Sequence, residues 1–136
     1  MPPEFRNKPE NDSSSVEVPA EDWSMFLDAF SRQHEGWLVT IAISTPESSQ
    51  VEAYARRLRG VSVDHLRGRH TAYIETGDEQ DSVLTHAVSG VARMVFLRSK
   101  SGAHRGLEII SADGTKTRMI FRSAILPDMV SGLGAA

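Results

Sequence analysis

The sequence has 136 residues, 40% hydrophobic and 24% charged, which is enough for one domain with a hydrophobic core. It contains no cysteine, which excludes disulfide bonds, thiolate nucleophiles and cysteine-ligated metal centres. The net charge is −3, although residues 56–70 alone contain five arginines and one acid. An acidic chain of this kind is not typical of nucleic-acid-binding proteins.

The N-terminal 17 residues are rich in proline, serine, asparagine and charged residues. We predict a disordered tail over 1–17, a single globular domain over 18–131 and a frayed C-terminus over 132–136. No apolar run approaches the roughly 18 residues that cross a bilayer, and the N-terminus lacks the apolar segment of a secretion signal. We therefore expect a cytoplasmic protein with no membrane contact.

Residues 19–34 are predicted to form an amphipathic helix. Pro19 suits the first helical position, and Gly36 can adopt the left-handed conformation that ends a helix. The large apolar residues follow the spacing i, i+3, i+4 and i+7: Trp23, Phe26, Leu27 and Phe30. This spacing places them on one face, which we expect to be buried.

After the helix, β-branched and aromatic residues in short runs predict strands. The predicted strands cover 37–43, 71–76, 82–88, 92–98, 107–111 and 116–123. Residues 51–58 have the propensity of a helix, but Gly60 followed by Val61 and Val63 favours a strand with a bend over 51–63. Asp113-Gly114 is a strong hairpin-turn signal.

Most of these strands are joined by short connections, which require antiparallel neighbours. The apolar face of the helix can cover one face of such a sheet. We therefore predict an α+β fold, mainly β. In this fold, the N-terminal amphipathic helix packs on a curled antiparallel sheet or small barrel of about seven strands.

Two runs, "VPAEDWSMFLDAFSRQHEGWLVTIAI" and "SADGTKTRMIFRSAILPDMV", resemble a family of small bacterial proteins, domain of unknown function 5335. The matching residues of the first run are Trp23, Phe26, Phe30, Ser31, His34, Gly36, Trp37, Leu38 and Val39. Those near the end are Glu108, Ile109, Ser111, Ala112, Asp113, Gly114, Phe121, Arg122, Ser123, Pro127 and Met129. The resemblance covers roughly residues 18–131 and is weak over 50–70. It implies a bacterial protein and an architecture, but no activity.

His34, Glu35 and His86 are candidates for a polar site. Adjacent helical residues point about 100° apart, so His34 and Glu35 do not converge on one ligand. We interpret His34 as a histidine that bonds to free carbonyls at the helix end. His86 lies in the middle of a predicted strand, where it is either a hydrogen-bonded, half-buried residue or a partner of His34 across the fold.

The arginine segment is a candidate surface for nucleic acid or another polyanion: Arg56, Arg57, Arg59, Arg67 and Arg69. Strand alternation would place Arg56 and Arg57 on opposite faces, which weakens this interpretation. The alternative is an edge strand that its positive charge protects from aggregation. The acidic stretch 77–81 lacks the ligand array of a calcium loop and is interpreted as a polar turn.

The sequence contains no G-x-S-x-G, P-loop or H-E-x-x-H motif. We therefore expect a non-enzymatic domain that acts through an interaction surface, for example as a homodimer, with no cofactor and no metal. Polyanion binding through the arginine segment is the first alternative. A hydrolase or metal-dependent enzyme that uses His34 and His86 is the second.

Overall fold

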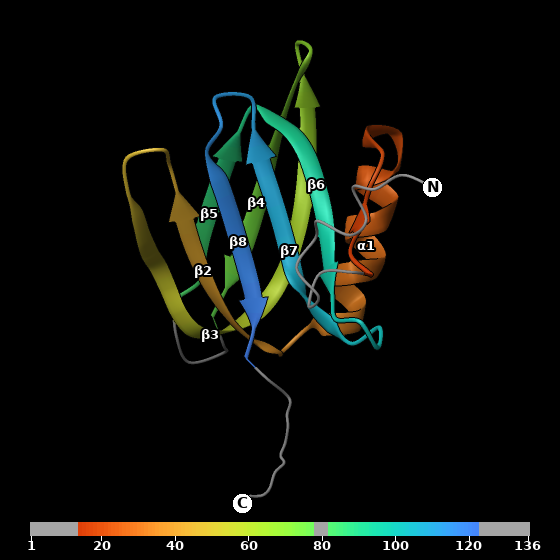
Figure 1. The fold of residues 1–136 in the computed structure, drawn as a ribbon, viewed down its shortest axis with the longest axis vertical. Helices are drawn as coiled ribbons and strands as arrows, with labels where there is room; N and C mark the ends of the chain where they lie inside the picture. The colour runs from red at the N-terminus through yellow and green to blue at the C-terminus, as the bar shows by residue number, and fades with distance from the viewer. Residues whose placement is uncertain (1–13, 78–81, 123–136) are drawn as a thin grey trace, which may run out of the picture.

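A computed structural model describes residues 14–77 and 82–122 of the chain (Figure 1). In chain order the elements are β1 (Val16–Glu17), η3 (Ala20–Asp22), α1 (Trp23–His34), β2 (Leu38–Ser44), β3 (Ser49–Leu66), β4 (Arg69–Thr76), β5 (Leu84–Ser89), β6 (Val91–Arg98), β7 (His104–Ser111) and β8 (Lys116–Phe121). The predicted α+β fold, mainly β, is confirmed. None of the helices among the described residues is long and apolar enough to cross a membrane.

The eight described strands form one antiparallel sheet in the order β1-β6-β7-β8-β2-β3-β4-β5. Because β1 and β5 are its two edges, the sheet is curled but not closed, and the predicted barrel alternative is wrong. Helix α1 lies beside β6 in Figure 1 and also contacts the β3–β4 part of the sheet.

Strand β3 links the two parts of the sheet. Its first half pairs with β2, and from Leu58 onward it pairs with β4. The register shifts between Leu58 and Gly60, as the predicted bend requires. At this point Ser31 of α1 fixes the helix to the strand, because its hydroxyl accepts a hydrogen bond from the Val61 N–H at 2.8 Å and donates one to the Val61 carbonyl at 3.0 Å.

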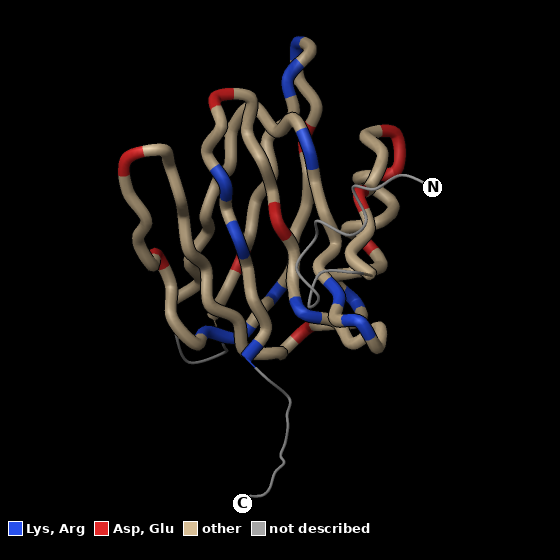
Figure 2. Tube along the Cα trace, in the orientation of Figure 1, with Lys and Arg blue, Asp and Glu red and all other residues tan. Residues whose placement is uncertain are grey.

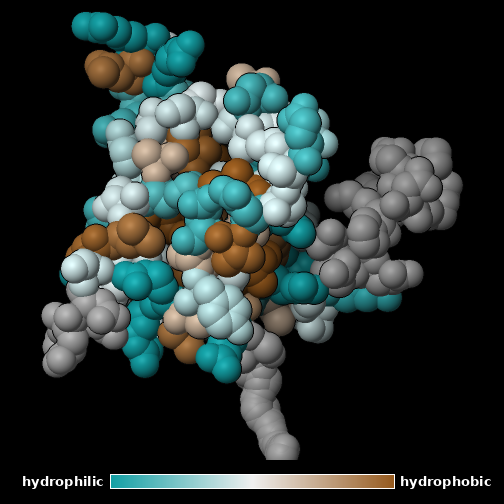
Figure 3. All heavy atoms as spheres, turned by 90° about the vertical axis from the view of Figure 1, so that its left-hand side faces the viewer, coloured by the Kyte–Doolittle hydropathy of each residue, from teal (hydrophilic) through white to brown (hydrophobic). Residues whose placement is uncertain are grey.

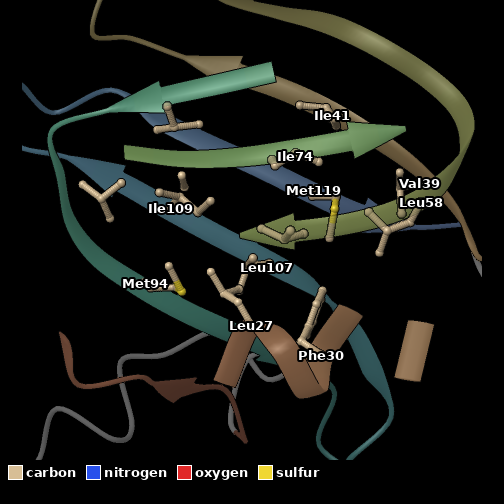
Figure 4. Close-up of a cluster of buried hydrophobic side chains, with 14 of the residues drawn as sticks. Leu27, Phe30, Val39, Ile41, Leu58, Ile74, Met94, Leu107, Ile109 and Met119 are labelled. Carbon is tan, nitrogen blue, oxygen red and sulfur yellow. The ribbon is translucent and has the colours of Figure 1, made fainter. Parts of the chain in front are cut away.

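The core lies between α1 and the inner face of the curled sheet. Trp23, Leu27 and Phe30 are buried, as the helical spacing predicts, while Phe26 is partly buried and packs against Phe96. Figure 4 shows Leu27 and Phe30 reaching from the helix toward the labelled strand side chains: Val39, Ile41, Leu58, Ile74, Met94, Leu107, Ile109 and Met119. Full burial of each such side chain contributes about 1.5–3 kcal/mol.

Strand β1 lies within the segment 1–17 that the sequence predicts as a tail. Val16 and Glu17 pair with Phe96 and Val95 of β6, and Glu17 also forms an ion pair with Arg93 at 2.8 Å. The described structure therefore includes residues before the predicted boundary at 18, because this segment extends the sheet. Residues 1–13, the acidic stretch over 78–81 and the predicted C-terminal fraying over 132–136 lie outside the described residues.

The hairpin between β7 and β8 has the predicted turn. The Gly114 N–H donates to the Ser111 carbonyl at 2.9 Å, and the Thr115 N–H donates to the Asp113 carboxylate at 2.9 Å. The backbone hydrogen bond lowers the pKa of Asp113. Gly114 has a positive φ of 92°, which a side chain would disfavour.

Candidate functional site

The structure does not bring the five candidate arginines together. Arg56, Arg57 and Arg59 lie where β3 passes from β2 to β4, whereas Arg67 and Arg69 lie at the tip of the β3–β4 hairpin. An extended strand from residue 57 to residue 67 spans about 33 Å. Figure 2 shows the hairpin tip and the lower end of the molecule as separate basic regions in blue.

Arg56 and Arg57 also have partners within the protein. The Arg56 guanidinium donates to the hydroxyl of buried Thr76 at 3.0 Å and to the Ser82 carbonyl at 2.9 Å. Arg57 donates to the Gly36 carbonyl at 3.0 Å. These contacts give both arginines a role in holding neighbouring segments of the chain.

His34 is the last residue of α1, and only 1% of its surface is exposed. Its Nδ1 lies 2.7 Å from the Phe30 carbonyl oxygen. Because a carbonyl only accepts hydrogen bonds, Nδ1 carries the hydrogen, and Nε2 of the neutral ring is an acceptor. Burial lowers the pKa of His34, as does the charge of His104, and the bond to Phe30 acts in the opposite direction.

The partner of His34 is His104 at the start of β7, a residue that the sequence did not single out. His34 Nε2 and His104 Nδ1 are 2.8 Å apart. Since His34 Nε2 accepts, His104 Nδ1 donates, and the Nε2 atom of the exposed His104 ring is left without a hydrogen in the neutral form. His86 is placed elsewhere, on edge strand β5 opposite Ile74, and Glu35 is exposed beside the helix end.

Aromatic rings surround this histidine pair. His34 stacks on Phe121 at 4.6 Å between ring centroids and meets the edge of Trp37 at 4.6 Å. His104 contacts Phe96 at 4.9 Å. These rings exclude water from His34, which is why burial is the largest influence on its pKa.

Basic residues collect around the C-terminal end of α1. Arg57 reaches this end through its bond to Gly36, and Arg122 through its backbone N–H, which donates to the Leu38 carbonyl at 2.8 Å. Figure 2 shows further blue segments at the same lower end of the molecule. The only acid that follows the helix directly is Glu35.

The other basic residues come from β6, β7 and their connection. Arg98 lies directly opposite His104 in the β6–β7 pairing. Lys100 lies in the connection that follows Arg98, and Arg105 follows His104. We use the term basic end for this group: Trp37, Arg57, Arg98, Lys100, His104, Arg105 and Arg122.

Strand β5 forms a second notable surface, because among the described strands only β4 pairs with it. Its sequence, LTHAVS, contains no lysine, arginine, aspartate, glutamate or proline. Leu84 and the preceding Val83 are 45% and 50% exposed. Figure 3 views the side of the molecule that carries β2, β3 and β5, where hydrophobic patches in brown lie among hydrophilic atoms.

Within residues 14–77 and 82–122, no three histidine, cysteine, aspartate or glutamate side chains are grouped so that they could hold a metal ion. In comparisons with known proteins, a model of a family of unknown function, DUF5335, matches residues 14–128. No curated protein and no solved structure matches the chain.

Proposed function

Because this chain belongs to DUF5335, a family of unknown function, we propose a function from its own surface. The resemblance carried by the two sequence blocks is thereby confirmed, and it transfers no activity. The proposed function is that of a non-enzymatic interaction domain of the bacterial cytoplasm. It pairs with a second copy of itself through the outer edge of β5.

The observation that carries this proposal is the outer edge of β5, with which no described strand pairs. Edge strands in monomeric proteins are usually very short, bulged, or carry charged residues or proline, because a free edge otherwise pairs with another strand. The opposite edge, β1, has two residues and an ion pair, and the free edge of the first half of β3 carries Glu52. By contrast, β5 has six uncharged residues in continuous register with β4.

A second copy is the partner that this edge fits best. Two antiparallel β5 strands related by a twofold axis at Ala87 can place His86 opposite Val88 and Thr85 opposite Ser89, so that no like charges face each other. Exposed Val83 adds apolar surface beside the paired edges. A six-residue strand buries less area than a standard interface, so we expect a weak dimer that depends on concentration.

The two alternatives have less support. Polyanion binding through the arginine segment needs a continuous surface, but the arginines lie at two ends of the second half of β3. An enzyme built on His34 and His86 needs the two rings close together, but the hydrogen-bonding partner of His34 is His104.

The dimer is tested by measuring molecular mass in solution over about a hundredfold range of protein concentration. We expect the wild-type mass to rise from 15.0 kDa toward twice that value. Ala87→Lys, which adds a charge to the exposed edge, should keep the protein monomeric. The control Ala92→Lys adds the same charge at an exposed position of β6 and should leave the dimer intact. A monomeric wild type, or an Ala87→Lys variant that dimerises equally well, would contradict the proposal.

A further inference from the structure

We propose that the basic end binds a small phosphate-bearing anion and that His104 and Arg122 contact its phosphate groups. This inference concerns the end of the molecule at the C-terminus of α1 and does not depend on pairing through β5. It rests on the local charge, on the neighbours of His104 and Arg98, and on the exposed ring of Trp37.

The local charge differs in sign from that of the whole chain. Its five lysine and arginine residues and one acid, Glu35, give this end a charge of +4 with neutral histidines, while the whole chain carries −3. The remaining residues therefore sum to −7. A basic region on an acidic protein concentrates anions locally and gives the ligand one defined site of attraction.

Arg98 supplies an unusual donor beside this surface. Its Nε atom is buried, and among the described residues it has no hydrogen-bond partner. Buried polar groups are almost always paired, and a buried guanidinium N–H without an acceptor is costly. Because Arg98 faces His104 across the β6–β7 ladder, an anion bound at His104 would supply compensating negative charge beside this guanidinium.

His34 positions His104 for this role. The Phe30 carbonyl fixes the hydrogen of His34 on Nδ1, and His34 Nε2 then accepts the Nδ1 hydrogen of His104 at 2.8 Å. The outer Nε2 of His104 is an acceptor when the ring is neutral and a donor to phosphate when it is protonated. The charged or titratable groups nearest His104 are His34 on α1, Arg98 on β6 and the adjacent Arg105. Since these described neighbours include no carboxylate, an anion should promote proton uptake by His104.

Trp37 can distinguish the source of the phosphate. The residue is 39% exposed, and its ring contacts His34 and Phe121 at 4.6 and 4.8 Å between centroids. An exposed indole beside arginines can stack with an aromatic base. A nucleotide should therefore bind more tightly than an inorganic phosphate and quench tryptophan fluorescence. Equal binding of the two would mean that only the phosphate groups are recognised.

The test is isothermal titration calorimetry of the full chain with inorganic pyrophosphate and, separately, with ADP at low salt. We expect Arg122→Gln and His104→Gln each to weaken binding about tenfold, the size expected for loss of one charge-assisted hydrogen bond. Arg67→Gln and Arg69→Gln make the same change at the opposite end of the β3–β4 hairpin. These matched controls should retain affinity within about twofold.

Proton uptake gives a second measurement that a purely structural role of His104 would not change. Titrations in two buffers of different ionisation enthalpy should show proton uptake on binding by the wild type, and less by His104→Gln. Absence of binding for both probes at low salt would overturn the proposal. The proposal would also fail if Arg67→Gln and Arg69→Gln weakened binding as much as Arg122→Gln and His104→Gln do. Unchanged proton uptake in His104→Gln would contradict it as well.

Discussion

At the scale of single residues, His34 combines the roles of a core residue and a polar link. It is as deeply buried as Leu27 and Phe30 on the same helical face, yet both of its ring nitrogens have partners. A buried polar group without partners would destabilise the fold, and here one bond is to the helix and the other to β7. The same residue therefore completes the core and connects α1 to the opposite strand.

The pKa of His34 predicts how stability depends on pH. Burial lowers this pKa from the ordinary value of 6.5, so the unfolded chain binds a proton at a higher pH than the folded chain. The stabilising contribution is complete above pH 6.5 and is lost as the pH falls through the lower, folded-state pKa. We expect the free energy of unfolding in urea to decrease over this acidic range.

The variant His34→Gln should show a smaller decrease over the same range, even if it is less stable at every pH. His65→Gln is the control, because His65 is exposed and should leave the slope of the wild type unchanged. If wild type and His34→Gln had parallel dependence on pH, His34 would not be the group that titrates.

The sequence could predict that His34 ends the helix, because Gly36 and the change of period at Trp37 are local signals. It could not predict His104 as its partner, since 70 positions separate the two histidines. His104 also lies just before Gly106, which makes the segment resemble a loop. The structure explains this glycine: an added Cβ would lie 2.0 Å from the Met119 carbonyl oxygen, so β7 and β8 can approach only with glycine there.

At the scale of elements, α1 is the part of the fold that the sequence predicts best. Its apolar spacing identified the buried face, and the strand runs identified every described strand except β1. A two-residue strand such as β1 has too few positions to show a period. Whether the sheet closes depends on whether its edge strands, β1 and β5, meet and pair, and local patterns carry no such information.

Replacing Trp23 by alanine tests how strongly α1 is held on the sheet. Its side chain is 3% exposed, contacts His70 edge-on at 4.8 Å, and donates from Nε1 to the Val18 carbonyl at 2.8 Å. Loss of these contacts should lower the free energy of unfolding by about 3–5 kcal/mol. Met25→Ala on the same helix removes a side chain that is 73% exposed and should cost less than about 0.5 kcal/mol. A loss below about 1 kcal/mol for Trp23→Ala would mean that the indole does not anchor the helix.

At the scale of the whole molecule, the last described strand, β8, joins two parts of the sheet that come from distant regions of the sequence. Strand β8 lies between β7 and β2, with Phe121 opposite Val39 and Lys116 opposite Ser44. Without β8, the strands β1, β6 and β7 lose their hydrogen-bonded connection to β2, β3, β4 and β5. Buried Met119 and Phe121 would also be missing from the core.

A chain that ends at Thr115 should therefore lack a cooperative unfolding transition, whereas a chain that ends at Arg122 retains β8 and should fold. A chain that begins at Val18 should also fold, because it lacks only β1 at the edge and keeps the bond from the Val18 N–H to the Met94 carbonyl at 2.8 Å. Circular dichroism during urea unfolding measures whether each truncated chain has a cooperative transition. The dispersion of amide signals in NMR spectra measures whether it is folded. A cooperative transition in the chain ending at Thr115 would show that the two parts of the sheet are stable without their shared strand. In that case α1 and the β5–β6 connection, rather than β8, would hold the halves together.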